Sequence, residues 1–260
     1  MRVRTLGLSV LLALTCAASL QAQRIRGRRE AVDYSQFNTR YDGRFTFLRL
    51  RYAPLARGWS RFGGGDEGWA HDYPRAERNL MKLLAELTEI RPYMDGGNIF
   101  PMDDKEIFKY PIAYLSEPGF WSLTEQEAAG LRAYLHKGGF LIVDDFDGYD
   151  WVNFEEKMRQ VLPEGTLMPL DVSHPVFHSF FDIESLETLS FGNYRSVRQG
   201  AEYHGIFENN DPQGRLMVVV NYNNDIGDYW EWSDQGFFPI ELSNEAYKLG
   251  INYIVYAMTH

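Results

Sequence analysis

Hydrophobic and polar positions along the chain switch between a period of two and a period near 3.6, which predicts strands and helices in turn. Residues 44–52, RFTFLRLRY, alternate apolar with polar side chains and are rich in aromatics, as in a strand. Arg49 in this strand needs a partner, either a loop acid or water at an edge position. A helix with one apolar face follows, formed by Leu80, Leu83, Leu84, Leu87 and Ile90. We predict Asp72 as the N-cap of this helix, with Pro74 in its first turn.

The clearest unit is a strand, a helix and a second strand. YPIAYLS, residues 110–116, and FLIVDD, residues 140–145, are nearly continuous apolar runs, which is typical of parallel strands covered on both faces. Thr124 and Glu127 form a capping box at the start of the helix between them. We therefore predict two adjacent parallel strands joined by a helix over Thr124–Lys137.

The second half of the chain continues the alternation. A helix is predicted over residues 153–163 with Asn153 as its cap, and a short strand over residues 166–171, TLMPLD. Two strands joined by a turn are predicted within residues 203–223, and a final helix over residues 243–260. This alternation predicts a three-layer α/β domain with a mostly parallel sheet and helices on both faces.

The N-terminus has the three-part layout of a secretory signal. Arg2 and Arg4 make a basic start, residues 6–20 form an apolar run, and Ala22 is a small residue suited to signal peptidase. The run falls short of the roughly 20 apolar residues that a membrane span needs, although retention of the segment as an anchor stays an alternative. We predict a signal peptide over residues 1–22, a flexible leader over 23–43 and a single domain over 44–260. The protein would then be exported to the periplasm or cell envelope, with no transmembrane helix in its mature form.

Composition narrows the chemistry of the mature chain. The only cysteine, Cys16, lies inside the predicted signal peptide, so no thiol remains for a disulfide, a zinc site or a nucleophile. The full chain has a net charge of −10, and loss of Arg2 and Arg4 leaves 24 basic residues against 36 acidic ones. Such a chain repels phosphate backbones, so we expect no nucleic-acid partner.

Three acids follow the apolar run in the stretch GGFLIVDDFDG. Asp144, Asp145 and Asp147 are expected at the carboxyl end of a central strand, where open α/β sheets bind ligands. With a nearby histidine they could hold Mg²⁺, Mn²⁺ or Zn²⁺, or form an acid–base pair in which one carboxyl has a raised pKa. The simpler interpretation is that they cap and shape a turn. No cofactor is predicted, and no residue is assigned as a metal ligand.

A second polar stretch, NYNNDIGDYWEW over residues 221–232, follows the apolar strand RLMVVV. Asn223 and Asp225 should therefore also emerge at the carboxyl end of a strand. Trp230 could stack on the ring face of a sugar, as tryptophans in glycan sites do. The alternative is a polar turn with Trp230 buried against the domain.

Four ordered motifs carry a resemblance to a known family. They are YPIAYLSEPGFWSLTEQEAAGLRAYLHKGGFLIVDD, SHPVF, NYNNDIGDYWEW and AYKLGINYIVYAMT. With them the chain resembles the bacterial domain-of-unknown-function family 4159 from about Phe45 to Thr259. The resemblance implies a class I glutamine amidotransferase-like fold, which is flavodoxin-like, in exported or membrane-associated proteins. It also implies envelope proteins of the MoxR and von Willebrand A type systems as partners.

The resemblance also shows what this chain lacks. In working amidotransferases the corresponding turn carries a cysteine nucleophile, and a later His-x-Glu supplies the base. Here the turn is DDFD, and His174 is followed by Pro175 and Val176, so glutamine hydrolysis by that route is excluded. His174 stays a candidate because its motif is shared with the family, although a structural histidine at a helix start is an equal alternative.

The predicted function is that of an exported envelope protein whose noncatalytic, amidotransferase-like domain binds a polar ligand or a protein partner. The alternatives are a carboxylate–histidine hydrolase, with or without a metal, and a glycan-binding module. The ligand-binding candidates are Asp144, Asp145, Asp147, His174, Asn223, Asp225 and Trp230. We expect the aspartates, His174 and Asn223 to converge at the carboxyl edge of the sheet, with Asp145 facing the crevice. If His174 lay at the opposite edge, the acids would only form turns.

Overall fold

The computed structural model describes residues 34–55, 68–187 and 200–260. The predicted signal peptide lies outside these ranges. Phe37–His260 forms one unit, and residues 1–36 form another, of which the structure describes only the last three. Within the described ranges, no helix combines the length and the apolar character that crossing a bilayer requires.

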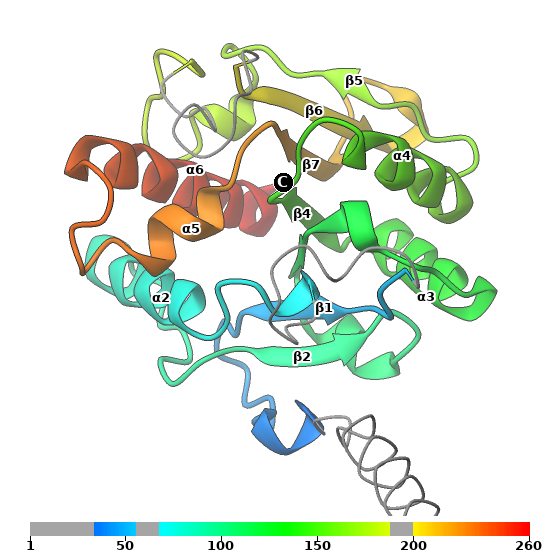
Figure 1. The fold of residues 1–260 in the computed structure, drawn as a ribbon, viewed down its shortest axis with the longest axis horizontal. Helices are drawn as coiled ribbons and strands as arrows, with labels where there is room; N and C mark the ends of the chain where they lie inside the picture. The colour runs from blue at the N-terminus through cyan, green and yellow to red at the C-terminus, as the bar shows by residue number, and fades with distance from the viewer. Residues whose placement is uncertain (1–33, 56–67, 188–199) are drawn as a thin grey trace, which may run out of the picture. The chain divides into compact units, whose positions relative to one another are not determined.

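A seven-stranded sheet runs through the Phe37–His260 unit in the order β2-β1-β3-β4-β7-β6-β5 (Figure 1). Its strands are β1 (Leu48–Arg51), β2 (Asn98–Pro101), β3 (Ile112–Ser116), β4 (Phe140–Asp144), β5 (Met168–Pro169), β6 (Glu202–Phe207) and β7 (Leu216–Tyr222). Neighbours from β2 to β7 pair in parallel, and β6 is antiparallel to both β7 and β5. The predicted parallel pairing of β3 with β4 is therefore confirmed.

Helices cover both faces of this sheet. On one face α2 (Arg75–Leu87), α5 (Ile226–Glu231) and α6 (Ile240–Thr259) pack together, and on the other lie α3 (Glu125–His136) and α4 (Asp150–Val161) (Figure 1). Every residue of β3 and β4 is buried, as the apolar runs predicted. The domain is thus the predicted three-layer, mostly parallel α/β sandwich, and its architecture is consistent with a flavodoxin-like fold.

Two helix starts differ from the prediction. α4 begins at Asp150, and Asn153 lies inside it, where its amide donates to the carbonyls of Pro118 and Trp121. α2 begins at Arg75, and the carboxylate of Asp72 does not cap it. Only the carbonyl of Asp72 accepts from the first helix amides, and its backbone φ of 64° lies in the left-handed region. The side chain of Asp72 is therefore free for another role.

The chain that precedes β1 covers the edge strand β2. Asn38 exchanges two hydrogen bonds with the backbone of Ile99, and the backbone of Thr39 exchanges two with the side chain of Asn98. Such bonds satisfy groups that an edge strand otherwise leaves open to other chains. The contacts of the domain therefore begin before residue 44, within the stretch that the sequence assigned to the leader.

A buried arginine ties the sheet to the loop ahead of α2. Arg49 on β1 is 1% exposed, and its Nε donates to Glu77 of α2 at 2.5 Å. Its guanidinium lies over the ring of Tyr114, and its Nη1 donates to the carbonyls of Trp69 and His71, both at 2.8 Å. The partners of Arg49 are thus a helix acid and two loop carbonyls. Through them Arg49 fixes the position of the segment from Trp69 to His71, just ahead of α2.

Loss of the Arg49 charge is expected to destabilise the fold. Arg49→Met leaves Glu77 buried without its partner, which costs about 3–5 kcal/mol in the free energy of unfolding. The double variant with Glu77→Met should recover only part of this loss, because the carbonyls of Trp69 and His71 have still lost their bonds from Arg49. Urea unfolding of the wild type, both single variants and the double variant measures the effect. A double variant as stable as the wild type would show that the two carbonyl bonds contribute nothing.

Candidate functional site

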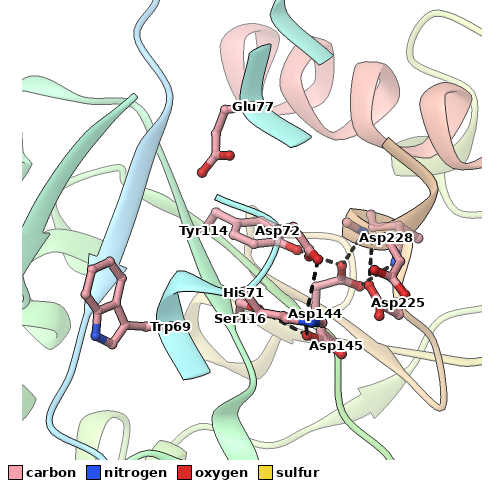
Figure 2. A network of polar contacts seen from close by, with 12 residues as sticks. Trp69, His71, Asp72, Glu77, Tyr114, Ser116, Asp144, Asp145, Asp225 and Asp228 are labelled. Carbon is pink, nitrogen blue, oxygen red and sulfur yellow. Dashed lines mark hydrogen bonds and ion pairs between the residues drawn. The ribbon is translucent and has the colours of Figure 1, made fainter. Parts of the chain in front are cut away.

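The candidate site is a cluster of acidic side chains with one histidine (Figure 2). Its members are His71, Asp72, Glu117, Asp145, Asp225, Asp228 and Glu231. They come from the chain segments that follow β1, β3, β4 and β7. Because parallel strands end at the same edge of a sheet, residues far apart in the sequence meet there.

Asp145 lies in the turn that follows β4. Its backbone φ is 64°, a conformation that residues other than glycine adopt rarely and mostly where the surroundings enforce it. Its Oδ2 lies 2.7 Å from Nδ1 of His71 and accepts a hydrogen bond from Oγ of Ser116 at 3.3 Å. Burial opposes ionisation, but the charge of His71 outweighs it and holds the pKa of Asp145 below its ordinary value. Asp145 is therefore an anion at neutral pH.

His71 faces two carboxylates. Its Nδ1 lies 3.4 Å from Oδ1 of Asp72 in addition to its contact with Asp145, and 44% of its side chain is exposed. Burial lowers the pKa of His71, but the charges of Asp145 and Asp72 outweigh burial and raise that pKa above its ordinary value. The imidazole is therefore protonated at neutral pH. Its backbone carbonyl is held by Arg49, which keeps the ring beside the acids.

The carboxylate of Asp72 has no hydrogen-bond donor. Its side chain is fully buried, and in the described part of the chain no N–H or O–H group donates to either oxygen. Oδ1 of Asp72 is the oxygen near His71. Oδ2 packs against Gly227, so closely that a Cβ atom added to this glycine would lie 2.4 Å from it. Burial, and next the charge of Asp145, raise the pKa of Asp72 well above its ordinary value. A buried carboxylate without a donor is costly unless a proton or a cation accompanies it.

Asp225 and Asp228 bring two further carboxylates from α5. Asp225 caps this helix, with its Oδ1 accepting from the backbone N–H of Asp228 at 2.8 Å. A carboxylate oxygen of Asp228 lies within 4.8 Å of one on Asp225 and of one on Asp72. Burial, and next the charge of Asp145, raise the pKa values of both residues. In Figure 2, Asp72 lies between His71 on one side and the two α5 acids on the other.

Asp144 has a different role from its neighbour. Its Oδ2 accepts from the hydroxyl of Tyr114 at 2.7 Å and from the amide of Gly227 at 3.0 Å. Its Oδ1 accepts from the side chain of Asn221 at 3.1 Å and from the amide of Ile226 at 3.3 Å. Burial raises the pKa of Asp144 to about 7. These four bonds join β3, β4, β7 and α5, so Asp144 positions the site.

The prediction for His174 is wrong. Its ring lies 5.5 Å from the ring of Phe207 and 6.0 Å from that of Tyr256, and Phe207 pairs with Leu216 at the start of β7. His174 is therefore at the amino edge of the sheet, opposite the acids. The expected consequence, that the acids then only form turns, does not hold, because His71 supplies the imidazole beside Asp145.

Most of the remaining predicted residues also lie outside the cluster. Trp230 is buried in the core, and its indole N–H donates to the carbonyl of Ala246 at 3.0 Å, so its ring is not available to a sugar. Asp147 lies in the β4–α4 turn, outside the acidic cluster of the described residues. Asn223 is buried at a φ of 53°, and its side-chain amide has no partner among the residues described. Of the seven candidates, the cluster contains Asp145 and Asp225, with Asp144 bonded beside them.

Five members of the cluster are not among the candidates predicted from the sequence: His71, Asp72, Glu117, Asp228 and Glu231. His71 and Asp72 lie in the connection that follows β1, so the rule that was applied to β4 and β7 also covers them. Asp72 was assigned as a cap because an aspartate two residues before a proline is typical of a helix start. Asp228 is in the same polar stretch as Asp225, three residues farther on, and therefore on the same side of a helix.

One comparison with known proteins gives a match. The family model described as "Domain of unknown function (DUF4159)" matches residues 46–258. The chain therefore belongs to this family, which confirms the resemblance found in the sequence. The matched range includes every member of the acidic cluster. No curated protein matches the sequence.

Neutralising Asp72 is expected to stabilise the cation-free protein. Asp72→Asn removes a carboxyl that ionises freely in the unfolded chain but is disfavoured as an anion in the folded one, which should raise the free energy of unfolding by about 1–3 kcal/mol at about pH 8. A carboxyl whose pKa is higher in the folded state than in the unfolded state contributes stability at low pH. That contribution is complete below the unfolded-state pKa, which is near 4 for a carboxyl, and it is lost as the pH rises through the folded-state pKa. The wild type therefore loses stability from about pH 4 upward, and the advantage of the variant should grow over the same range.

Chemical denaturation in EDTA at a series of pH values measures this difference. Asp211→Asn, in the β6–β7 turn at the other edge of the sheet, is the matched control and should behave as the wild type does. An Asp72→Asn variant that is less stable than the wild type at every pH would show that Asp72 contributes favourable interactions to the cation-free fold.

Proposed function

We propose that this member of the family is an exported envelope protein whose domain binds a divalent metal cation at the acidic cluster. The observation that carries the proposal is the buried carboxylate of Asp72, which has no donor among the described residues. One oxygen each from Asp72, Asp145 and Asp225 lie within 4.8 Å of one another. A cation among the three would balance their charge and provide the missing partner.

The spacing of these oxygens suits a small, hard cation. In an octahedral shell with ligands at about 2.1 Å, adjacent oxygens are about 3 Å apart and opposite ones about 4 Å. Three oxygens within 4.8 Å of one another can reach such positions through small side-chain movements. Carboxylates with an imidazole nearby favour Mn²⁺ or Mg²⁺, whereas ions that prefer thiolates lack a ligand in a mature chain without cysteine.

His71 links the binding of a cation to the loss of a proton. The imidazolium lies beside Asp145 and Asp72, where a divalent cation would repel it. Release of the proton leaves a neutral Nδ1 that can bind the cation or accept a hydrogen bond from a ligand water. The affinity for the cation should therefore rise with pH.

Divalent cations are expected to stabilise the folded protein. At a free Mn²⁺ concentration about 100-fold above Kd, binding to the folded state alone contributes about 2.7 kcal/mol. In Asp225→Asn most of this effect should be lost, because one of the three carboxylates is neutral. Asp211→Asn keeps the cluster intact and should show the full effect.

Thermal unfolding after treatment with EDTA, with Mn²⁺, Mg²⁺, Ca²⁺ and Zn²⁺ added in turn, makes this measurement. A wild-type midpoint that none of the four cations shifts would overturn the proposal. An equal shift in Asp225→Asn and the wild type would place the cation elsewhere on the chain.

The export part of the proposal is supported by the basic start, the apolar run and Ala22 in the sequence. We expect cleavage after Ala22 and a mature protein that begins near Gln23. N-terminal sequencing of the protein from envelope and cytoplasmic fractions of its bacterial cell tests this expectation. A full-length chain confined to the cytoplasm would contradict it. Envelope partners of the MoxR and von Willebrand A type follow from the family resemblance alone.

A further inference from the structure

We infer that the acidic cluster holds two divalent cations, with Asp72 as the carboxylate that they share. This inference rests on the proposed function, because it adds a second cation to the first. The inner set of ligands is Asp72, Asp145 and Asp225, and an outer set of Asp72, Asp228 and Glu231 also brings its oxygens within 4.8 Å of one another. Asp72 is the residue that both sets contain.

The two oxygens of Asp72 face different neighbours. Oδ1 lies 3.4 Å from Nδ1 of His71, which in turn lies 2.7 Å from Asp145 of the inner set. Oδ2 packs against Gly227 of α5, the residue before Asp228 of the outer set. Neither oxygen has a donor among the described residues. A cation in the inner set satisfies Oδ1 and leaves Oδ2 buried without a partner, whereas a second cation in the outer set satisfies it.

The charge of the two sets fits two cations better than one. The sets contain five carboxylates, whose formal charge is −5 when all are ionised and His71 is neutral, as it is once a cation has displaced its proton. One divalent cation leaves a charge of −3 in a cluster whose inner members are all buried, and two reduce it to −1. Asp228 has an oxygen within 4.8 Å of Asp72 and of Asp225, and carboxylates this close repel one another unless a proton or a cation lies between them.

The two positions differ in their access to water. All three inner ligands are buried, whereas Asp228 and Glu231 of the outer set are half-buried. Water competes more strongly for the outer cation, so it should bind more weakly and exchange faster than the inner one. A carboxylate that bridges two cations holds them about 4 Å apart, which is the spacing at which two-metal sites bind and activate water. The outer position is therefore the one where a ligand from solution would first contact metal.

The number of bound Mn²⁺ ions tests the inference. The full mature chain is stripped with EDTA and titrated with Mn²⁺ alone, with bound ion measured by isothermal titration calorimetry and by electron paramagnetic resonance. We expect two ions per wild-type chain, the second bound at least about tenfold more weakly than the first. Glu231→Gln should bind one ion, with the affinity of the tighter site changed less than about threefold. Asp72→Asn should lose both, and Asp211→Asn should keep both.

Each outcome decides the matter. One ion per wild-type chain, with the same ratio in Glu231→Gln, overturns the two-cation inference and leaves the proposed function standing. No bound Mn²⁺ in the wild type overturns both. Asp228→Asn neutralises a second ligand of the outer set and should also bind one ion. The result therefore does not depend on how the Glu231→Gln variant folds. Circular dichroism and unfolding in EDTA establish that each variant is native before it is titrated.

Discussion

The carboxylate of Asp144, with its four buried hydrogen bonds, is the interaction on which the arrangement of the site depends. It draws the first amides of α5 against the end of β4, and this places Gly227 where its missing side chain makes room for Asp72. From the other side Arg49 donates to the carbonyls of Trp69 and His71. These bonds hold His71 and Asp72 close to the other acids. The like charges of the cluster are thus held together by two buried networks that lie outside it. Because both networks are anchored in the sheet, the acidic side chains are positioned before any ligand binds.

Backbone conformation shows that the same edge of the sheet stores strain. Asp72, Glu117, Asp145 and Asn223 all have φ values between 50° and 64°, and all four lie in segments that follow parallel strands. Residues other than glycine rarely adopt this left-handed conformation. Where they do, the surrounding structure enforces it, most often at functional sites. Here the strain turns carboxylates toward one another against their mutual repulsion. We therefore expect this edge to be less stable than the packing of the core alone would make it.

The sequence predicted the framework well because its signals are local. A parallel strand–helix–strand unit is specified by the apolar runs of β3 and β4 and by the capping box of α3, independently of the loops. The end of β4 then places Asp145 at the carboxyl edge of the sheet. The same rule covers the connection that follows β1, but it does not select His71 as the partner of Asp145. His71 is 74 residues away, and nothing in its neighbourhood distinguishes it from His174, whose shared motif proved to be at the other edge of the sheet. An aspartate can serve equally well as a helix cap or as a metal ligand, so its residue type does not decide the role of Asp72. Only its left-handed backbone conformation distinguishes the two roles. Trp230 has the composition of a sugar-binding loop, yet six residues of that loop form α5, which turns the ring into the core.

The turn after β4 carries a carboxylate where the resemblance to amidotransferases implies a nucleophile. The resemblance to amidotransferases implies a nucleophile in this turn with an imidazole nearby, and here Asp145 occupies the turn at a left-handed φ with His71 2.7 Å away. A carboxylate at that position is a weak nucleophile but a strong ligand for a hard cation, especially where other carboxylates surround it. The missing thiol closes the route through a covalent thioester. An oxygen-ligand set in the same place favours a domain that works through a bound cation, whether it holds a polar ligand by the open positions of that cation or activates a water there. Both the binding and the hydrolytic interpretations of the sequence then depend on one physical condition, the presence of positive charge between Asp72 and its neighbours.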